Sequence, residues 1–197
     1  MLRPRGGDFV YTQDEVNVML EDLRAMKLIG VTGFVFGALD STGALDEVVC
    51  KRLLQAARPA LCTLHRAFDL AKDWRSALDQ AITLGFKAVL TSGQAPTAIA
   101  GRDRLKKIKK EAGDQIHIMA GSGVNSNTLP TLLSDTGCRW FHGSASVPVE
   151  TKGPRNRIAM GSLDTNVHRV TSKEEVRNMR DLIDSFFGSK PIITPYY

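Results

Sequence analysis

The chain has 197 residues, the length of one domain with room for a hydrophobic core. Hydrophobic residues make up 43% of it and charged residues 24%, as is typical of a globular protein, and its formal net charge is +5. The longest nearly apolar run, residues 28–39, is too short to cross a bilayer, so the sequence predicts no membrane partner.

Six short apolar runs, each ending in polar or glycine residues, predict strands. They lie at residues 1–2, 33–36, 61–64, 88–90, 116–119 and 139–141. Amphipathic helical patterns follow them along the chain. This alternation predicts a parallel sheet built from repeated βα units.

The predicted helices carry start and stop signals. Thr12 and Glu15 form a capping box ahead of the first, and Gly30 ends it. Later helices are predicted over 46–57, from 73 to the stop at 85, from about 101 to 112, from 125 or 126 onward, and from the caps at 171 and 172 to about 187. Pro130 is compatible with the fifth helix only in its first turn.

The fold class predicted from these elements is α/β, an incomplete TIM-type (β/α) barrel of six parallel strands with surrounding helices. A complete eight-unit barrel usually needs about 250 residues, so the first two units are expected to be absent. The barrel domain is predicted over residues 1–187 and a flexible C-terminal tail over 188–197. Two unpaired sheet edges would favour a homo-oligomer.

Cysteine content and charge pattern indicate the cellular setting. Cys50, Cys62 and Cys138 are odd in number and widely spaced, which predicts free thiols in a reducing compartment. No secretory leader is recognisable, so we expect a cytoplasmic protein, with the nucleus as a second location. The basic run 102–110 has no interleaved aromatic residues, which favours a solvated helix face over a specific nucleic-acid surface.

Two predicted strand ends are rich in glycine and hydroxyl groups. Gly121, Ser122 and Gly123 follow the fifth apolar run, and His142 and Ser144 follow the sixth. Bare backbone N–H groups in such loops can bind a small oxyanion, and in parallel barrels reactive residues gather at these strand ends. The alternative is that the glycines only form tight turns, and the sequence leaves both interpretations open.

Charged residues gather at other strand ends. These further candidate ligand-binding residues are Arg3, Arg5, Asp8, His65, Arg66, Asp69 and Ser92. Arginine suits bidentate contacts to carboxylate or phosphate. For Asp8 and Asp69, a structural role as partners that hold the arginines is slightly favoured over a direct role in ligand binding. His65 is the best candidate for proton transfer, because its ordinary pKa permits it. No catalytic triad or Schiff-base lysine pattern stands out, so no reaction is assigned.

Metal-binding patterns are sparse. The chain has neither Cys-x-x-Cys nor a His-x-x-x-His pair, and strand alternation places Cys62 and His65 on opposite faces. The residues present therefore support no cofactor, and metal ligands stay unassigned.

Several longer motifs carry a family resemblance. In chain order they read RPRGGDFVY, GFVFGALDSTGALD, LHRAFDLAKDW, LGFKAVLTSG, MAGSGVNSNTL and FHGSA. Together they closely resemble the CutC copper homeostasis family. The resemblance implies a TIM barrel, a cytoplasmic location, self-association and a role in Cu(I) binding or trafficking.

The chain departs from the family pattern in two ways. Family members carry two βα units ahead of RPRGGDF, which in many members hold the proposed Cu(I)-binding cysteines, and they often have cysteine where this chain has Gly143. The soft thiolates that favour Cu(I) are therefore largely missing, and we expect impaired copper handling. A truncated isoform produced by splicing, a mispredicted start and an expressed fragment are all consistent with the sequence. The alternative hypothesis is an enzyme acting on a phosphorylated or carboxylated small molecule at the arginine-rich strand ends.

Overall fold

The centre of the computed structural model, which describes residues 1–150 and 167–188, is a five-stranded parallel sheet. Its strands lie in the order β1 (Gly33–Phe36), β2 (Leu61–Leu64), β3 (Ala88–Thr91), β4 (His117–Gly121) and β5 (Trp140–His142). Neighbours in the sheet are also neighbours in sequence, which is the arrangement that successive βα units produce. The α/β class and five of the six predicted strands are confirmed.

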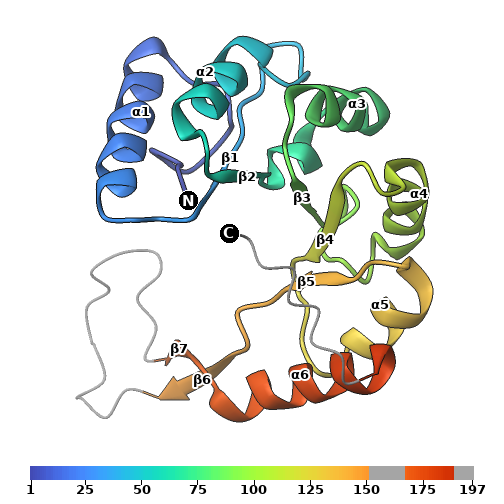
Figure 1. The fold of residues 1–197 in the computed structure, drawn as a ribbon. Helices are drawn as coiled ribbons and strands as arrows, with labels where there is room; N and C mark the ends of the chain where they lie inside the picture. Colours follow the sequence, from blue (N-terminus) through green and yellow to red (C-terminus); the bar gives the residue numbers. More distant parts are fainter. Residues whose placement is uncertain (151–166, 189–197) are drawn as a thin grey trace.

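Helices cover the outer side of this sheet. They are α1 (Gln13–Leu28), α2 (Glu47–Ala57), α3 (Trp74–Leu84), α4 (Arg102–Ala112) and α5 (Leu129–Thr136), and a short 3₁₀ helix, η1 (Arg66–Leu70), follows β2. Figure 1 shows the sheet curving with α1 to α5 arranged around its outside and the N-terminus within the curve. Buried apolar side chains of strands and helices form one cluster between them.

Local sequence accounts for the helix ends. The Thr12 hydroxyl accepts from the Glu15 N–H while the Glu15 carboxylate accepts from the Thr12 N–H, so the predicted capping box is confirmed. Asp46 caps α2 by accepting from the Val49 N–H, and Asp73 caps α3 by accepting from the Arg75 N–H, in both cases without a reciprocal bond. Gly85, with a φ of 94°, ends α3 in the left-handed conformation that glycine adopts without strain.

The predicted start of the fifth helix is wrong. α5 begins at Leu129, because the Asn125 side chain accepts from the N–H groups of Asn127 and Thr128 and holds these residues in a turn. Pro130 consequently lies in the first turn of the helix.

The first predicted strand, at residues 1–2, is also wrong. The Leu2 N–H donates to the Val35 carbonyl over 2.8 Å, but neither Met1 nor Leu2 belongs to a strand. Two residues offer too few backbone groups for a ladder of hydrogen bonds. The parallel sheet therefore has five strands where the sequence predicts six.

An antiparallel hairpin follows β5 and forms a separate two-stranded sheet. It consists of β6 (Ser146–Glu150) and β7 (Val167–Thr171), and α6 (Lys173–Phe187) begins after the cap at Ser172. The sequence missed this hairpin because its strands do not fit the βα repeat. Within the hairpin, His168 of β7 lies opposite Val149 of β6. Residues 189–197, most of the predicted tail, lie outside the described part of the chain.

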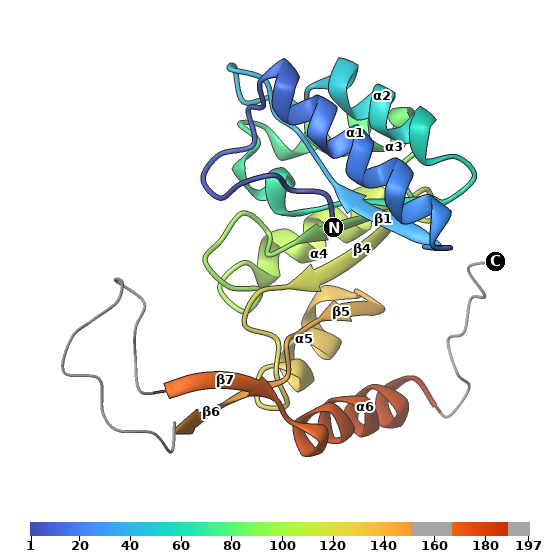
Figure 2. The same cartoon turned by 90° about the vertical axis from the view of Figure 1, so that its left-hand side faces the viewer.

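The loops that follow the parallel strands determine where a site can form. The loops after β2, β3 and β4 lie on one side of the molecule together with the hairpin, at the left in Figure 2. Among the described helices, none has the length and apolarity needed to span a membrane.

Candidate functional site

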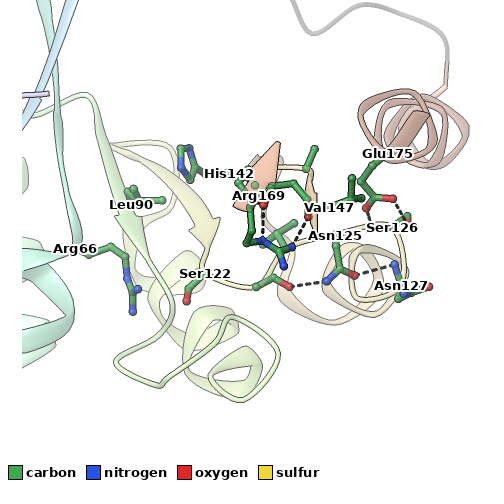
Figure 3. Close-up of a pocket in the computed structure, with 16 residues that line it drawn as sticks. Arg66, Leu90, Ser122, Asn125, Ser126, Asn127, His142, Val147, Arg169 and Glu175 are labelled. Carbon is green, nitrogen blue, oxygen red and sulfur yellow. Dashed lines mark hydrogen bonds between the residues drawn. The ribbon is translucent and has the colours of Figure 1, made fainter. Parts of the chain in front are cut away.

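A pocket of about 530 Å³ opens at the carboxyl ends of β4 and β5. Figure 3 shows Arg66 and Ser122 on one side of it, and Asn125 and Arg169 on the other. His142 is exposed at the end of β5 and lines the same pocket. Segments far apart in the chain therefore meet here, in a volume typical of small-molecule sites.

The loop after β4 forms one wall. Ser122 has a φ of 79°, which is unusual for a residue other than glycine, and its hydroxyl donates to the Pro96 carbonyl over 2.9 Å. Gly123 follows with a φ of 71°, and the Asn125 side chain donates to its carbonyl over 3.3 Å. The loop is thus held in one conformation by its own polar groups.

The loop after β5 approaches that wall closely. A Cβ added at Gly143 would lie 2.7 Å from the Val124 carbonyl oxygen and 2.9 Å from Met179 Cε. The Gly123 and Gly143 N–H groups have no hydrogen-bond acceptor within residues 1–150 and 167–188. Both can therefore donate to a ligand.

Replacing Gly143 with alanine tests this close approach. We expect the free energy of unfolding to fall by roughly 1–3 kcal/mol, because the backbone of Val124 must shift to admit the methyl group. Urea denaturation followed by circular dichroism measures the change. Gly6→Ala is the control, because a Cβ at Gly6 would have no other atom within 4 Å. Equal effects of the two substitutions would contradict this close contact between the loops.

Arg66 is held in place at the mouth of the pocket by a buried carboxylate. Its Nε donates to Asp69 Oδ2 over 2.7 Å, and its Nη2 donates to Ser92 Oγ over 2.9 Å. The Asp69 side chain is only 6% exposed and also accepts from Thr91 Oγ1 at 2.5 Å and from the Gln94 N–H at 3.0 Å. The interpretation of Asp69 as a partner that orients an arginine agrees with these contacts.

Two charged pocket residues come from elements that follow the parallel sheet. Arg169 of β7 donates through Nε to Ser146 Oγ over 3.0 Å. Glu175 of α6 accepts from the Ser126 N–H at 2.7 Å and from the Ser126 hydroxyl at 2.8 Å. Sequence reasoning singled out neither Glu175 nor Arg169 as a site residue. The β-branched residues of 167–171 were the available signal for a strand there.

The N-terminal charged residues form a separate cluster. Arg5 Nη1 lies 2.9 Å from Asp8 Oδ1, and Arg5 Nε also pairs with Glu15. The hydrogen bond from Arg5 lowers the pKa of the Asp8 carboxyl. Arg3 lies over the Phe9 ring, 4.6 Å from its centroid. None of these side chains lines the pocket.

His65 is buried beside this cluster, with 3% of its surface exposed. Its ring lies 4.7 Å from that of Phe9, and its Nδ1 accepts from the Ala67 N–H. Nε2 has no hydrogen-bond partner in the described structure. Burial, with a smaller contribution from the Arg3 charge, lowers the pKa of His65 to about 4, so the ring is neutral at pH 7. A proton-transfer role for His65 stays a prediction.

The predicted site residues thus divide into two groups. The pocket brings together five of them: Arg66, Ser122, Gly123, His142 and Ser144. Those that do not line it are Arg3, Arg5, Asp8, His65, Asp69, Ser92 and Gly121. Asp69 and Ser92 act on the pocket indirectly, by holding Arg66.

The cysteines lie on separate elements. Cys50 is in α2, Cys62 in β2, and Cys138 follows α5; all three are free and buried. Burial raises the pKa of the Cys50 thiol to about 12 and that of Cys62 to about 11. Within the described residues, no three His, Cys, Asp or Glu side chains are grouped to hold a metal ion.

Comparison with known proteins gives one consistent match. Residues 1–147 match the model of the CutC family. A Caenorhabditis elegans protein named copper homeostasis protein cutC homolog is 46% identical over 180 residues, which cover 91% of this chain and 72% of that protein. The human protein of the same name is 39% identical over 184 residues, which cover 91% of this chain and 67% of that protein.

A solved structure extends this similarity to the fold. The crystal structure of the putative copper homeostasis protein CutC from Streptococcus agalactiae matches with a TM-score of 0.68 and 33% sequence identity, covering 72% of this chain and 70% of that one. Because the family model spans most of the chain and the relatives exceed 30% identity over most of their own length, this chain belongs to the CutC family.

Proposed function

We propose that this chain acts in copper homeostasis, the role named for its relatives. The observation that carries the proposal is the 46% identity to the Caenorhabditis elegans protein over 91% of the chain. In this role copper is a cargo that the protein binds or transfers. The names of the relatives support a role in copper homeostasis and specify no binding site. Expression in cells that lack their own CutC relative tests the proposal by growth in added copper. Restored tolerance supports it, and unchanged sensitivity argues against it.

The three cysteines do not form a tight Cu(I) site in the structure. Cu(I) favours thiolate and thioether ligands, but Cys50, Cys62 and Cys138 are buried on different elements, and burial raises the pKa of each thiol. A thiolate cluster formed by these three residues would require rearrangement of the core. We therefore assign the copper role to no particular side chain.

Titration with Cu(I) in the presence of a competing chromogenic chelator measures the affinity of the protein for Cu(I). We expect the chelator to keep most of the metal, because the buried protonated thiols are poor ligands. A variant in which all three cysteines are alanine should bind equally weakly. Tight stoichiometric binding that disappears in the alanine variant would contradict the conclusion drawn from thiol burial.

Three further features belong to the same proposal. The curved parallel sheet with helices on its outside supports a partial (β/α) barrel. The free thiols support a cytoplasmic location. β1 and β5 are the outer strands of the described sheet, and such edges support self-association.

A further inference from the structure

The polar groups of the pocket at the ends of β4 and β5 are unevenly satisfied. Among the described residues that line it, Glu175 is the one carboxylate, and it already accepts two hydrogen bonds from Ser126. The arginines of the pocket keep unused donors: Arg66 and Arg169 each use Nε and Nη2 and make no hydrogen bond through Nη1 within the described residues. A pocket whose carboxylate is already hydrogen-bonded and whose arginines keep spare donors favours an anionic ligand.

Arg66 is oriented in advance of any ligand. Asp69 and Ser92 fix the plane of its guanidinium, and the side chain remains 41% exposed at the pocket. Because Asp69 is itself held by Thr91 and Gln94, little conformational entropy remains to be lost on binding. The contacts leave the Nη1 side of the guanidinium for a ligand.

Donors also come from other walls of the pocket. Arg169 is anchored to Ser146, and the N–H groups of Gly123 and Gly143 have no acceptor among the residues described. Together with Arg66, these donors come from four separate segments, so they suit an anion with several oxygen atoms better than a planar carboxylate.

The pocket also has room and apolar surface for more than an inorganic ion. Its volume of about 530 Å³ falls in the range of small-molecule sites, and Leu90, Val124 and Val147 contribute apolar groups to its lining. We propose that this pocket binds a phosphorylated small molecule, a phosphomonoester whose phosphate and hydroxyl oxygens contact Arg66 and Arg169 from the two sides of the pocket (Figure 3). This ligand is independent of the proposed copper role, and its binding requires no metal.

Isothermal titration calorimetry with glycerol 3-phosphate, inorganic phosphate and glycerol tests the proposal on the full chain. We expect saturable one-to-one binding of glycerol 3-phosphate, weaker binding of inorganic phosphate and no binding of glycerol. Arg66→Gln and Arg169→Gln should each weaken glycerol 3-phosphate binding at least tenfold, because each removes a charged hydrogen-bond donor.

Arg75→Gln is the matched control. It removes the same charge, but Arg75 pairs with Glu111 between α3 and α4 and does not line the pocket. Its affinity should stay within twofold of the unchanged chain. If Arg66→Gln fails to fold, the result for Arg169→Gln decides whether the proposal holds. The Arg169 side chain hydrogen-bonds only to Ser146 within the described structure, so its replacement should disturb folding little. Absence of saturation, or equal weakening by the control, would overturn the proposal.

Discussion

Replacing Asp69 with alanine is expected to lower the free energy of unfolding by about 3 kcal/mol. The Asp69 side chain is 6% exposed and accepts hydrogen bonds from Arg66, Thr91, Ser92 and Gln94. The substitution leaves several of these donors buried without an acceptor, and each such group costs free energy. Urea denaturation at pH 7 measures the effect.

Asp8→Ala is a matched control for this experiment. Asp8 also pairs with an arginine three residues before it, but its side chain is 67% exposed, so water replaces the lost contact. We expect a much smaller change in stability. Asp69→Ala should in addition weaken glycerol 3-phosphate binding, because Arg66 loses the contact that orients it. Similar destabilisation by both substitutions would show that burial of Asp69 is not the cause.

Acidification should destabilise the protein through His65. Burial lowers the pKa of His65 to about 4, whereas the ordinary value in an unfolded chain is about 6.5. As pH falls below 6.5, the unfolded state takes up a proton that the folded state excludes, so stability falls progressively until about pH 4. The difference between the two pKa values corresponds to about 3 kcal/mol over this window.

Unfolding measured in urea at pH 7.0, 5.5 and 4.5 separates this effect from that of carboxylates. The carboxyl groups of Asp8, Glu15 and Asp40 have lowered pKa values in the folded state. They therefore destabilise the protein mainly when the pH falls below about 4, the ordinary pKa of a carboxyl group. His65→Asn keeps an acceptor for the Ala67 N–H but does not titrate. Its stability should change little between pH 7.0 and 4.5. An unchanged pH dependence in this variant would assign the effect to other groups.

The sequence predicted the repeating part of the fold because its signals are local. The capping box at Thr12, the apolar stripe of α1 and the left-handed glycine after α3 each depend on residues within a few positions of one another. Period and caps therefore located most helices and five parallel strands. The same reasoning failed for the hairpin, because β6 and β7 pair across residues 151–166 and form no βα unit.

The site was predictable only in part. Glycine and hydroxyl residues at the ends of β4 and β5 indicated one side of the pocket, because parallel strands end at a common edge. Arg169 and Ser146 line the pocket only because the β6–β7 hairpin packs beside it, and no local sequence pattern predicts that placement. Conversely, Arg3 and Arg5 follow a short apolar run as the other candidates do, yet contacts with Phe9 and Glu15 hold them in a separate cluster.

The sequence by itself determined the α/β class, the capped helices, the free cysteines and the family to which the chain belongs. Only the tertiary structure decided which polar residues share a pocket and which serve as supports. The physical reason is that helix and strand periodicity depends on neighbouring residues, whereas a pocket depends on contacts such as those of Arg66 with Ser92, 26 positions apart.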